Sequence, residues 1–184
     1  MVSCIDDFVR NDSTVYWTID GKPRNATYEN IIEARVDKEN TCIFISQGEK
    51  FIANKVNYLS NLGEIIYSCN DITSELFFGE SNKTLHLRSR IYASRLFKKY
   101  NIILVTIGQQ RTNQELFGFD MTGNIVFQRK LPEGYVAGYF SILNDKPSLI
   151  CDLPEVDADK YGRNRFNFRI DLMTGELSNK TLAY

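Results

Sequence analysis

The sequence predicts an all-β fold of antiparallel strands. Apolar and polar residues alternate in TVYWTID (residues 14–20), KFIANKVNYL (50–59) and RFNFRIDL (165–172), and a period of two is the pattern of half-buried strands. Glycine and other turn-forming residues separate these runs at short intervals. Helical periodicity is confined to two short stretches, residues 73–78 and 87–100, so helices contribute little to the predicted fold.

Length and composition define the class of protein. A chain of 184 residues can bury the core of one domain without disulfides, and we expect a single domain over residues 1–184. With 22 basic and 23 acidic residues the net charge is -1, so no general attraction to nucleic acid or to an anionic membrane is expected. No apolar run approaches the roughly 18 residues of a membrane span, and the N-terminus lacks the apolar region of a secretory signal.

Cysteine usage points to a reducing compartment. The four cysteines stand apart at Cys4, Cys42, Cys69 and Cys151, without a CxxC pair, and three of them adjoin apolar runs. This pattern favours reduced thiols buried in strands over a disulfide framework. We therefore expect a cytoplasmic protein.

A degenerate repeat organises the chain. Turn glycines recur at Gly21, Gly63, Gly123 and Gly175, each after an alternating strand, and a more uniformly apolar strand lies further upstream. In the three later units another strand precedes both. Each unit thus predicts an antiparallel meander that must stack on its neighbours to cover both faces. The approximate units are residues 1–28, 29–70, 71–134 and 135–184.

The turn segments FDMTGNIVFQRK and IDLMTGEL resemble the blades of quinoprotein-like and WD-type β-propellers. The resemblance implies a small four-bladed β-propeller, because repeats of roughly 40 to 50 residues are typical of propeller blades. The Trp-Asp and Gly-His signatures of WD repeats are absent, and no quinone-binding residue can be mapped, so the resemblance implies neither activity nor cofactor. Three strands are expected in the first unit and four in each of the others, unless the register is off by one strand. A β-sandwich or an open barrel is the alternative.

Residues for catalysis or metal binding are sparse, so we expect no enzyme, no cofactor and no metal. The single histidine, His86, has no nucleophile motif beside it, and neither HExxH, a P-loop nor GxGxxG occurs. Segment DADKYG begins like a calcium loop with Asp157 and Asp159, but Tyr161 takes the place of a third ligand and Phe168 that of the last glutamate. A solvated turn is therefore favoured. Carboxylate pairs for glycoside hydrolysis stay open, since they assemble from distant loops.

Loop length and composition suggest a binding face. If the strand after each turn glycine is outermost, the three longest predicted connections, residues 5–13, 69–90 and 152–164, decorate one side of the disc. These loops are acidic and aromatic, and Phe77–Phe78 is either tucked beneath its loop or an exposed hot spot. The predicted partner-binding residues are Asp6, Asp7, Phe77, Phe78, Tyr135, Asp152, Glu155, Asp157, Asp159 and Tyr161.

Such a face predicts one protein partner of basic character. The specific hypothesis is an immunity or inhibitor protein that neutralises a basic toxin, such as a nuclease, by covering its nucleic-acid groove. Alternatives are a sugar-binding or hydrolytic propeller that uses its central funnel, and a scaffold module. The basic stretch at 85–100 interleaves aromatics with cations, as nucleic-acid sites do, but its alternation reads as a strand that enters the core, so nucleic acid is disfavoured.

Overall fold

The computed structural model describes residues 5–110, 113–153, 158 and 161–183. The described chain is built from antiparallel strands in four sheets and one short 3₁₀ helix, as the alternating pattern predicts. It forms two compact units: unit 1 comprises Met1–Leu87 with Met121–Gly123, and unit 2 comprises Arg88–Asp120 with Asn124–Tyr184. Because the two units are not placed relative to one another, each is described by itself.

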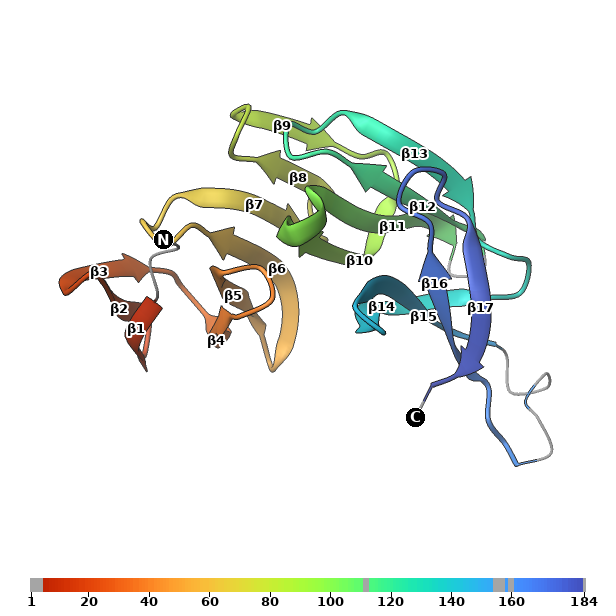
Figure 1. Cartoon of the computed structure of the whole chain (residues 1–184), viewed down its shortest axis with the longest axis horizontal. Helices are drawn as coiled ribbons and strands as arrows, with labels where there is room; N and C mark the ends of the chain where they lie inside the picture. The colour runs from red at the N-terminus through yellow and green to blue at the C-terminus, as the bar shows by residue number, and fades with distance from the viewer. Residues whose placement is uncertain (1–4, 111–112, 154–157, 159–160, 184) are drawn as a thin grey trace. The chain divides into compact units, whose positions relative to one another are not determined.

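Unit 1 holds two meanders, coloured red to yellow-green in Figure 1. The first sheet has the order β1-β2-β3 and the second runs β4-β5-β6-β7-β8-β9. The strand bounds are Ile5–Asn11 (β1), Thr14–Ile19 (β2), Lys22–Thr27 (β3), Ile31–Asp37 (β4), Cys42–Glu49 (β5), Ile52–Leu59 (β6), Ile65–Asn70 (β7), Glu75–Phe78 (β8) and Lys83–His86 (β9).

Unit 2 repeats this plan with two sheets of four strands, in the orders β10-β11-β12-β13 and β14-β15-β16-β17. Helix η1 (Lys98–Tyr100) connects β10 to β11. The strand bounds are Arg90–Phe97 (β10), Ile102–Gln110 (β11), Asn113–Phe119 (β12), Ile125–Lys130 (β13), Val136–Leu143 (β14), Lys146–Asp152 (β15), Arg165–Ile170 (β16) and Leu177–Leu182 (β17).

The order of strands predicted for the three later units is found in the structure. Strands β5, β11 and β15, the more uniformly apolar runs, are the second strands of their sheets and supply Ile43, Leu104 and Leu149 to the core. Each unit has its own apolar cluster, one around Trp17 and Ile45 and the other around residues of β10 to β16. Within each unit the core therefore lies between its two meanders, as the stacking argument requires.

Thiols behave as the sequence predicts wherever they are described. Cys42, Cys69 and Cys151 are reduced thiols in buried positions. Burial, reinforced by the neighbouring negative charge of Asp152, raises the pKa of the Cys151 thiol to about 12. Cys4 lies outside the described residues.

The recurring turn glycines explain why the chain repeats its hairpin. Gly21, Gly63, Gly123 and Gly175 all have positive φ, between 71° and 92°, which L-residues with side chains adopt only at a cost. Three of them also lie against an aromatic ring from elsewhere in the chain. A Cβ on Gly175 would stand 2.3 Å from Phe127, and one on Gly123 would stand 2.7 Å from Phe78. These turns therefore need glycine for its φ and for its small size.

Hydrogen bonds anchor the same turns. Trp17 Nε1 donates to the carbonyl of Asn61 at 2.7 Å, and Arg129 Nε donates to that of Thr174 at 2.8 Å. The carbonyl of Gly123 accepts from Lys83 Nζ at 2.9 Å. An aromatic or basic side chain thus satisfies a turn carbonyl at each site, so the turns are fixed to the core by polar as well as apolar contacts.

Two of the three predicted long loops are wrong. Residues 5–11 form β1, and the segment predicted as a loop at 69–90 contains β8 and β9, which extend the second sheet to six strands. The loop prediction at 69–90 failed because strand pairing is not visible in the sequence. Strand β8 pairs with β7 and buries Leu76 and Phe78, while its other two residues are half-buried. The first sheet has the predicted three strands.

No helix in the described part of the chain is long and apolar enough to cross a membrane.

Candidate functional site

Backbone hydrogen bonds gather several connections at one end of unit 1. Tyr28 N donates to Ser13 O at 2.7 Å and Gly48 N donates to Asn30 O at 3.0 Å. Further along the second sheet, Asp71 N donates to Asn54 O at 2.9 Å. The β1–β2 turn, the β3–β4 link, the β5–β6 tip and the β7–β8 turn therefore lie along one edge. We call this edge the loop end of unit 1, comprising residues 12–13, 28–30, 48–54 and 71–74.

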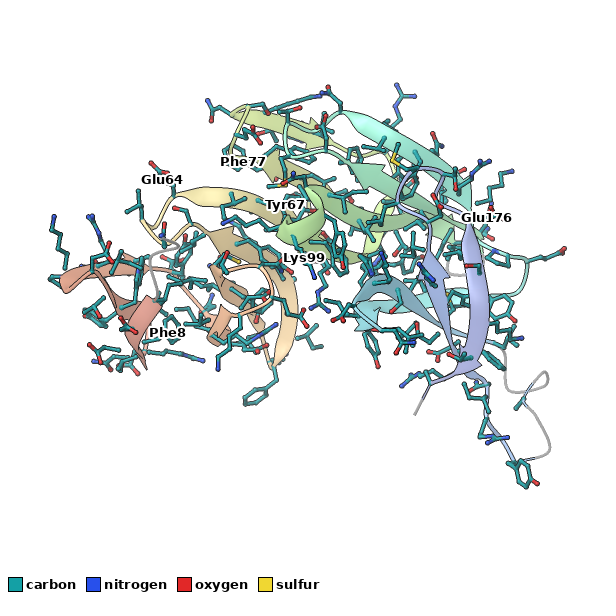
Figure 2. The ribbon with its side chains drawn as sticks, in the orientation of Figure 1. Phe8, Glu64, Tyr67, Phe77, Lys99 and Glu176 are labelled. Carbon is teal, nitrogen blue, oxygen red and sulfur yellow. The ribbon has the colours of Figure 1, made fainter. Side chains whose placement is uncertain are left out.

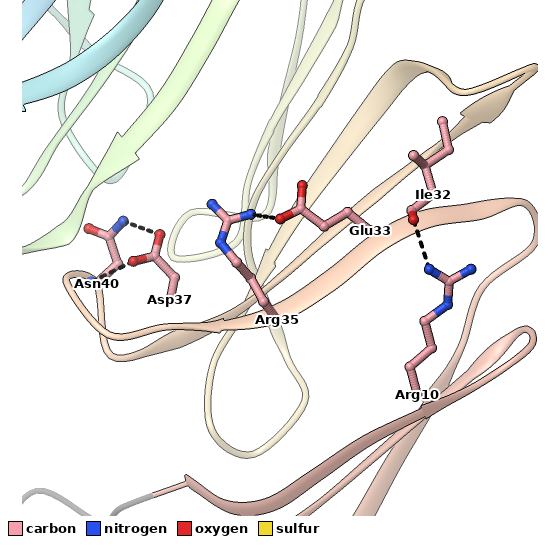
Figure 3. Close-up of polar contacts among 6 residues, drawn as sticks. All are labelled: Arg10, Ile32, Glu33, Arg35, Asp37 and Asn40. Atoms are coloured by element: carbon pink, nitrogen blue, oxygen red, sulfur yellow. Dashed lines mark hydrogen bonds and ion pairs between the residues drawn. The ribbon is translucent and has the colours of Figure 1, made fainter.

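Arg10 ties the first sheet to the second near this end. Its guanidinium donates to the carbonyl of Ile32 at 2.7 Å (Figure 3). It also donates to the carbonyl of Ile31 at 2.5 Å. Toward the other end of β4, Asp37 accepts from the side chain of Asn40 at 2.8 Å and closes the β4–β5 turn. Arg10 thus joins the first sheet to β4 beside the loop end, and the Asp37–Asn40 contact closes the opposite end of β4.

The predicted binding residues of the N-terminal segment are not in a loop. Asp6 and Asp7 lie at the start of β1, where Asp6 pairs with Thr18, whereas the β1–β2 turn joins Asn11 to Thr14. The length of the strand separates these two acids from the loop end of unit 1. Both are exposed, and Asp7 accepts a hydrogen bond from Thr18 Oγ1 at 3.2 Å. Their role in partner binding stays a prediction.

The phenylalanine pair belongs to β8, and its two members face opposite sides. Phe77 is half-buried (Figure 2), whereas Phe78 has no exposed surface and its ring centroid lies 5.7 Å from that of Tyr67. Of the two alternatives left open by the sequence, Phe78 follows the tucked one. A fully buried ring cannot touch a partner without unfolding its sheet, so Phe78 is a core residue.

Unit 2 brings Tyr135 and Asp152 to one edge, because Val136 pairs with Asp152 across β14 and β15. Tyr135 is half-buried and packs edge-on against Phe168, with ring centroids 5.1 Å apart. Asp152 accepts from Arg165 Nε at 2.7 Å, and this bond raises the pKa of Arg165. Asp152 is therefore already engaged by a cation of its own chain.

The rest of the predicted acidic loop is only partly described. Tyr161 is 68% exposed, with the Arg163 guanidinium 4.8 Å from its ring centroid. Glu155, Asp157 and Asp159 lie outside the described residues, so the binding and calcium predictions there stay untested. Among the described residues no group of three His, Cys, Asp or Glu side chains could hold a metal ion.

A cavity of about 490 Å³ lies beside β13 and β17. The described residues that line it are Arg129, Lys130, Pro132, Gly175, Glu176 and Leu177. Glycoside hydrolysis needs two carboxyl groups at fixed separation, and this lining supplies one, Glu176. The single histidine, His86, is 71% exposed at its side chain with Nδ1 3.1 Å from Glu75 Oε1. Among the described residues, neither the cavity lining nor the surroundings of His86 supply the two carboxyl groups that glycoside hydrolysis needs.

Sequence reasoning missed the most exposed apolar side chain at the loop end, Phe51, which is 96% exposed. The alternating pattern predicts a strand over residues 50–59, but β5 runs to Glu49 and the reversal into β6 takes place at Lys50–Phe51. Turn residues would have been the signal, since two-residue hairpin loops favour Asn-Gly. Lys-Phe carries no such signal.

Solved structures provide a comparison for this fold. Hsv2 of Kluyvelomyces marxianus is 11% identical over 94% of this chain and 53% of its own, with a TM-score of 0.45. The Cps50 (Swd1) beta-propeller domain of Myceliophteria thermophila is 12% identical over 96% of this chain and 70% of its own, with a TM-score of 0.50. The chain thus spans about half the length of the Hsv2 structure. No protein-family model and no curated protein matches the chain.

The comparison establishes a class of fold. The chain has a β-propeller fold, as the resemblance in its turn segments implies. At this level of identity the likeness concerns the fold alone and says nothing of partner or activity. The four-blade count stays a prediction.

Proposed function

We propose that this chain is a non-enzymatic protein-binding module. The observation that carries the proposal is the loop end of unit 1, where exposed carboxylates accompany exposed apolar side chains on connections held by backbone hydrogen bonds. Asp12, Glu29 and Glu49 are exposed there, as are Phe51, Ile52 and Ile72. Large apolar anchors within a polar rim are the anatomy of a protein interface.

The charge of this surface favours a basic partner. Surface carboxylates accelerate encounter with a positively charged protein and suppress encounter with acidic ones. The finer proposal is an immunity or inhibitor protein, located in the cytoplasm, whose acidic face covers a basic toxin such as a nuclease. Support for this finer step comes from the charge and the size of the chain.

Affinity chromatography with the tagged chain, followed by kinetics on the recovered protein, tests the module. Neutralising the loop-end acids (Asp12→Asn, Glu29→Gln, Glu49→Gln) should slow association severalfold at low salt and flatten its salt dependence. The matched control, Glu64→Gln with Glu133→Gln and Glu176→Gln, removes three exposed carboxylates from turns and links elsewhere and should leave both unchanged. Equal effects of the two variants would contradict an acidic docking face at this end.

The inhibitor step has a separate readout. The recovered partner should be a basic protein with nuclease or other toxic activity, and that activity should fall to zero at one equivalent of the chain. A partner that binds stoichiometrically but keeps its activity would reject the inhibitor proposal. The protein-binding module would still stand in that case.

A further inference from the structure

The β5–β6 hairpin carries an aromatic side chain that makes little use of its own fold. Glu49 pairs with Ile52, so Lys50 and Phe51 alone form the loop. Residue Phe51 is 96% exposed and Ile52 beside it is 71% exposed. A buried phenylalanine stabilises a protein by removing about 150 Å² or more of apolar surface from water. Because Phe51 is exposed, its side chain contributes almost none of this stabilisation.

The backbone of this loop is unfavourable for the residues that occupy it. Lys50 and Phe51 have φ of 50° and 66°, the left-handed pair of a type I′ turn, which normally selects Asn-Gly. A bulky residue with positive φ is an outlier that the surrounding structure must impose. Phe51 is thus costly in backbone conformation as well as in hydration.

Contacts below the loop hold it in this conformation. A Cβ on Gly48 would come within 1.9 Å of the Ile52 carbonyl oxygen, so only glycine allows the bulge there. Gln47 Nε2 donates to the carbonyl of Glu29 at 2.8 Å, and Asn57 Nδ2 donates to Gln47 Oε1 at 2.8 Å. These contacts fix the conformation of the β5–β6 hairpin before binding. Less conformational entropy of the loop is therefore lost when a partner binds.

The surroundings of the tip indicate what it fits. Ile72, 73% exposed, belongs to the turn whose Asp71 N donates to Asn54 O, so a third exposed apolar side chain lies along the same edge. Asp12, Glu29 and Glu49 provide exposed carboxylates. The cations there include Lys50 at the tip and Arg10, whose guanidinium is held on the carbonyls of Ile31 and Ile32.

We propose that Phe51, supported by Ile52, is the anchor that enters an apolar pocket of the protein partner, and that lysine or arginine side chains rim that pocket. The proposal rests on the protein-binding function above and names the chemistry of its partner. Carboxylates around the tip would be repelled by anionic lipid and by nucleic acid, so a protein is the favoured occupant. Aromatic anchors at the centre of an interface dominate its binding energy.

Photocrosslinking locates the contact on the full chain. The aromatic crosslinker p-benzoylphenylalanine is placed in turn at position 51, at position 161 in the predicted acidic loop, and at position 173, where Met173 is 79% exposed. Each variant is irradiated in lysate of the source organism and the adducts are mapped by mass spectrometry. An adduct from position 51 that maps to a partner segment with both apolar and basic residues is the expected result.

The mapped partner is then purified and its affinity measured. Phe51→Gly should weaken binding at least tenfold while the variant unfolds at nearly the native temperature, and Phe51→Asn should behave alike. The matched control Ile125→Ser removes another exposed apolar side chain, 58% exposed on β13, and should bind as the native chain does. Unchanged affinity of both Phe51 variants would overturn the inference.

The remaining outcomes separate this inference from the proposed function. Adducts from position 161 or 173 without one from 51 would leave the protein-binding module and reject the anchor. An adduct of twice the chain mass would identify a second copy as the occupant and reject the basic partner. Binding of the chain to neutral phosphatidylcholine vesicles, lost in Phe51→Gly, would assign the tip to a lipid surface. No adduct from position 51, with a partner recovered by affinity chromatography, would reject the anchor alone, whereas recovery of no partner would reject both proposals.

Discussion

Replacing Gly175 by alanine should destabilise unit 2 far more than the same change at Gly162. The two glycines have nearly the same backbone, with φ of 74° and 75°. They differ in what an added Cβ would meet: at Gly175 it would lie 2.3 Å from Phe127 Cδ2, whereas at Gly162 no described atom lies within 4 Å. The pair therefore separates the cost of left-handed backbone from that of lost space.

The expected magnitudes follow from these two terms. An L-residue in the left-handed region costs roughly 1–2 kcal/mol, and both variants bear this cost. Forcing a methyl group against a buried ring adds about 1–3 kcal/mol of overpacking, which applies to Gly175→Ala alone because Phe127 is 6% exposed and part of the core. We expect Gly175→Ala to cost about 2–5 kcal/mol in total. Unit 1 should repeat the contrast, with Gly123→Ala costing more than Gly21→Ala.

Urea unfolding followed by far-UV circular dichroism measures the difference. With an m-value of about 2 kcal/mol per molar urea, the extra 1–3 kcal/mol would lower the midpoint by roughly 0.5–1.5 M relative to Gly162→Ala. Phe127→Leu should reduce the additional cost, since it shrinks the ring that the new methyl group meets. Equal midpoints for the two alanine variants, or no coupling to Phe127, would refute the docking of the turn against the ring.

Three further expectations follow from single sites. In a Cys4→Ser background, Ellman's reagent at pH 8 should label no thiol until urea unfolds the chain. Cys42 and Cys69 are buried, and burial, reinforced by the charge of Asp152, raises the pKa of the Cys151 thiol to about 12. Rapid labelling of the folded chain would contradict this expectation. Hydrogen bonds from the backbone of Thr174 and Met173 and from the Thr174 hydroxyl lower the pKa of Asp171, so its stabilising effect is present above the unfolded pKa of about 3.9 and is lost as pH falls through the folded pKa below it. The stability difference between the native chain and Asp171→Asn should therefore shrink between pH 5 and pH 2 in urea titrations, and a difference constant with pH would exclude this linkage. Phe51→Gly should leave the free energy of unfolding within about 1 kcal/mol of the native value, because relief of the left-handed backbone offsets the greater entropy of unfolded glycine, whereas truncating buried Phe119 to alanine should cost about 3–5 kcal/mol.

The fold was predictable because its signals are local and repeated. Alternation identified β2, β6, β12 and β16, and the glycine after each marked a turn with positive φ. Neither signal depends on distant contacts, since period and turn chemistry are set by the pleat and by backbone sterics. The aromatic rings against Gly123 and Gly175 were beyond reach of the sequence, because those contacts join residues far apart in the chain.

The loops were harder to predict because edge strands need not be apolar. Strand β9 reads KTLH, with burial alternating only between half-buried and exposed, so its polar residues resemble a connection. What makes it a strand is pairing, as Leu76 of β8 lies opposite Leu85 of β9. Strand β1 shows the same difficulty, since most of its residues are exposed. Loop length inferred from polarity therefore overestimated the segments at 5–13 and 69–90.

The candidate site illustrates the opposite error, in which a strand pattern hides a loop. Residues Lys50 and Phe51 continue the alternation into β6, so the sequence places Phe51 within a strand, yet both adopt left-handed backbone in a two-residue reversal. Local preference opposes this conformation, and the pairing of Glu49 with Ile52 and the bulge at Gly48 impose it. Positions where local and global preferences conflict are those where function is expected to reside. That conflict, together with the exposure of the ring, is why Phe51 is the residue whose removal should weaken partner binding while the fold stays intact.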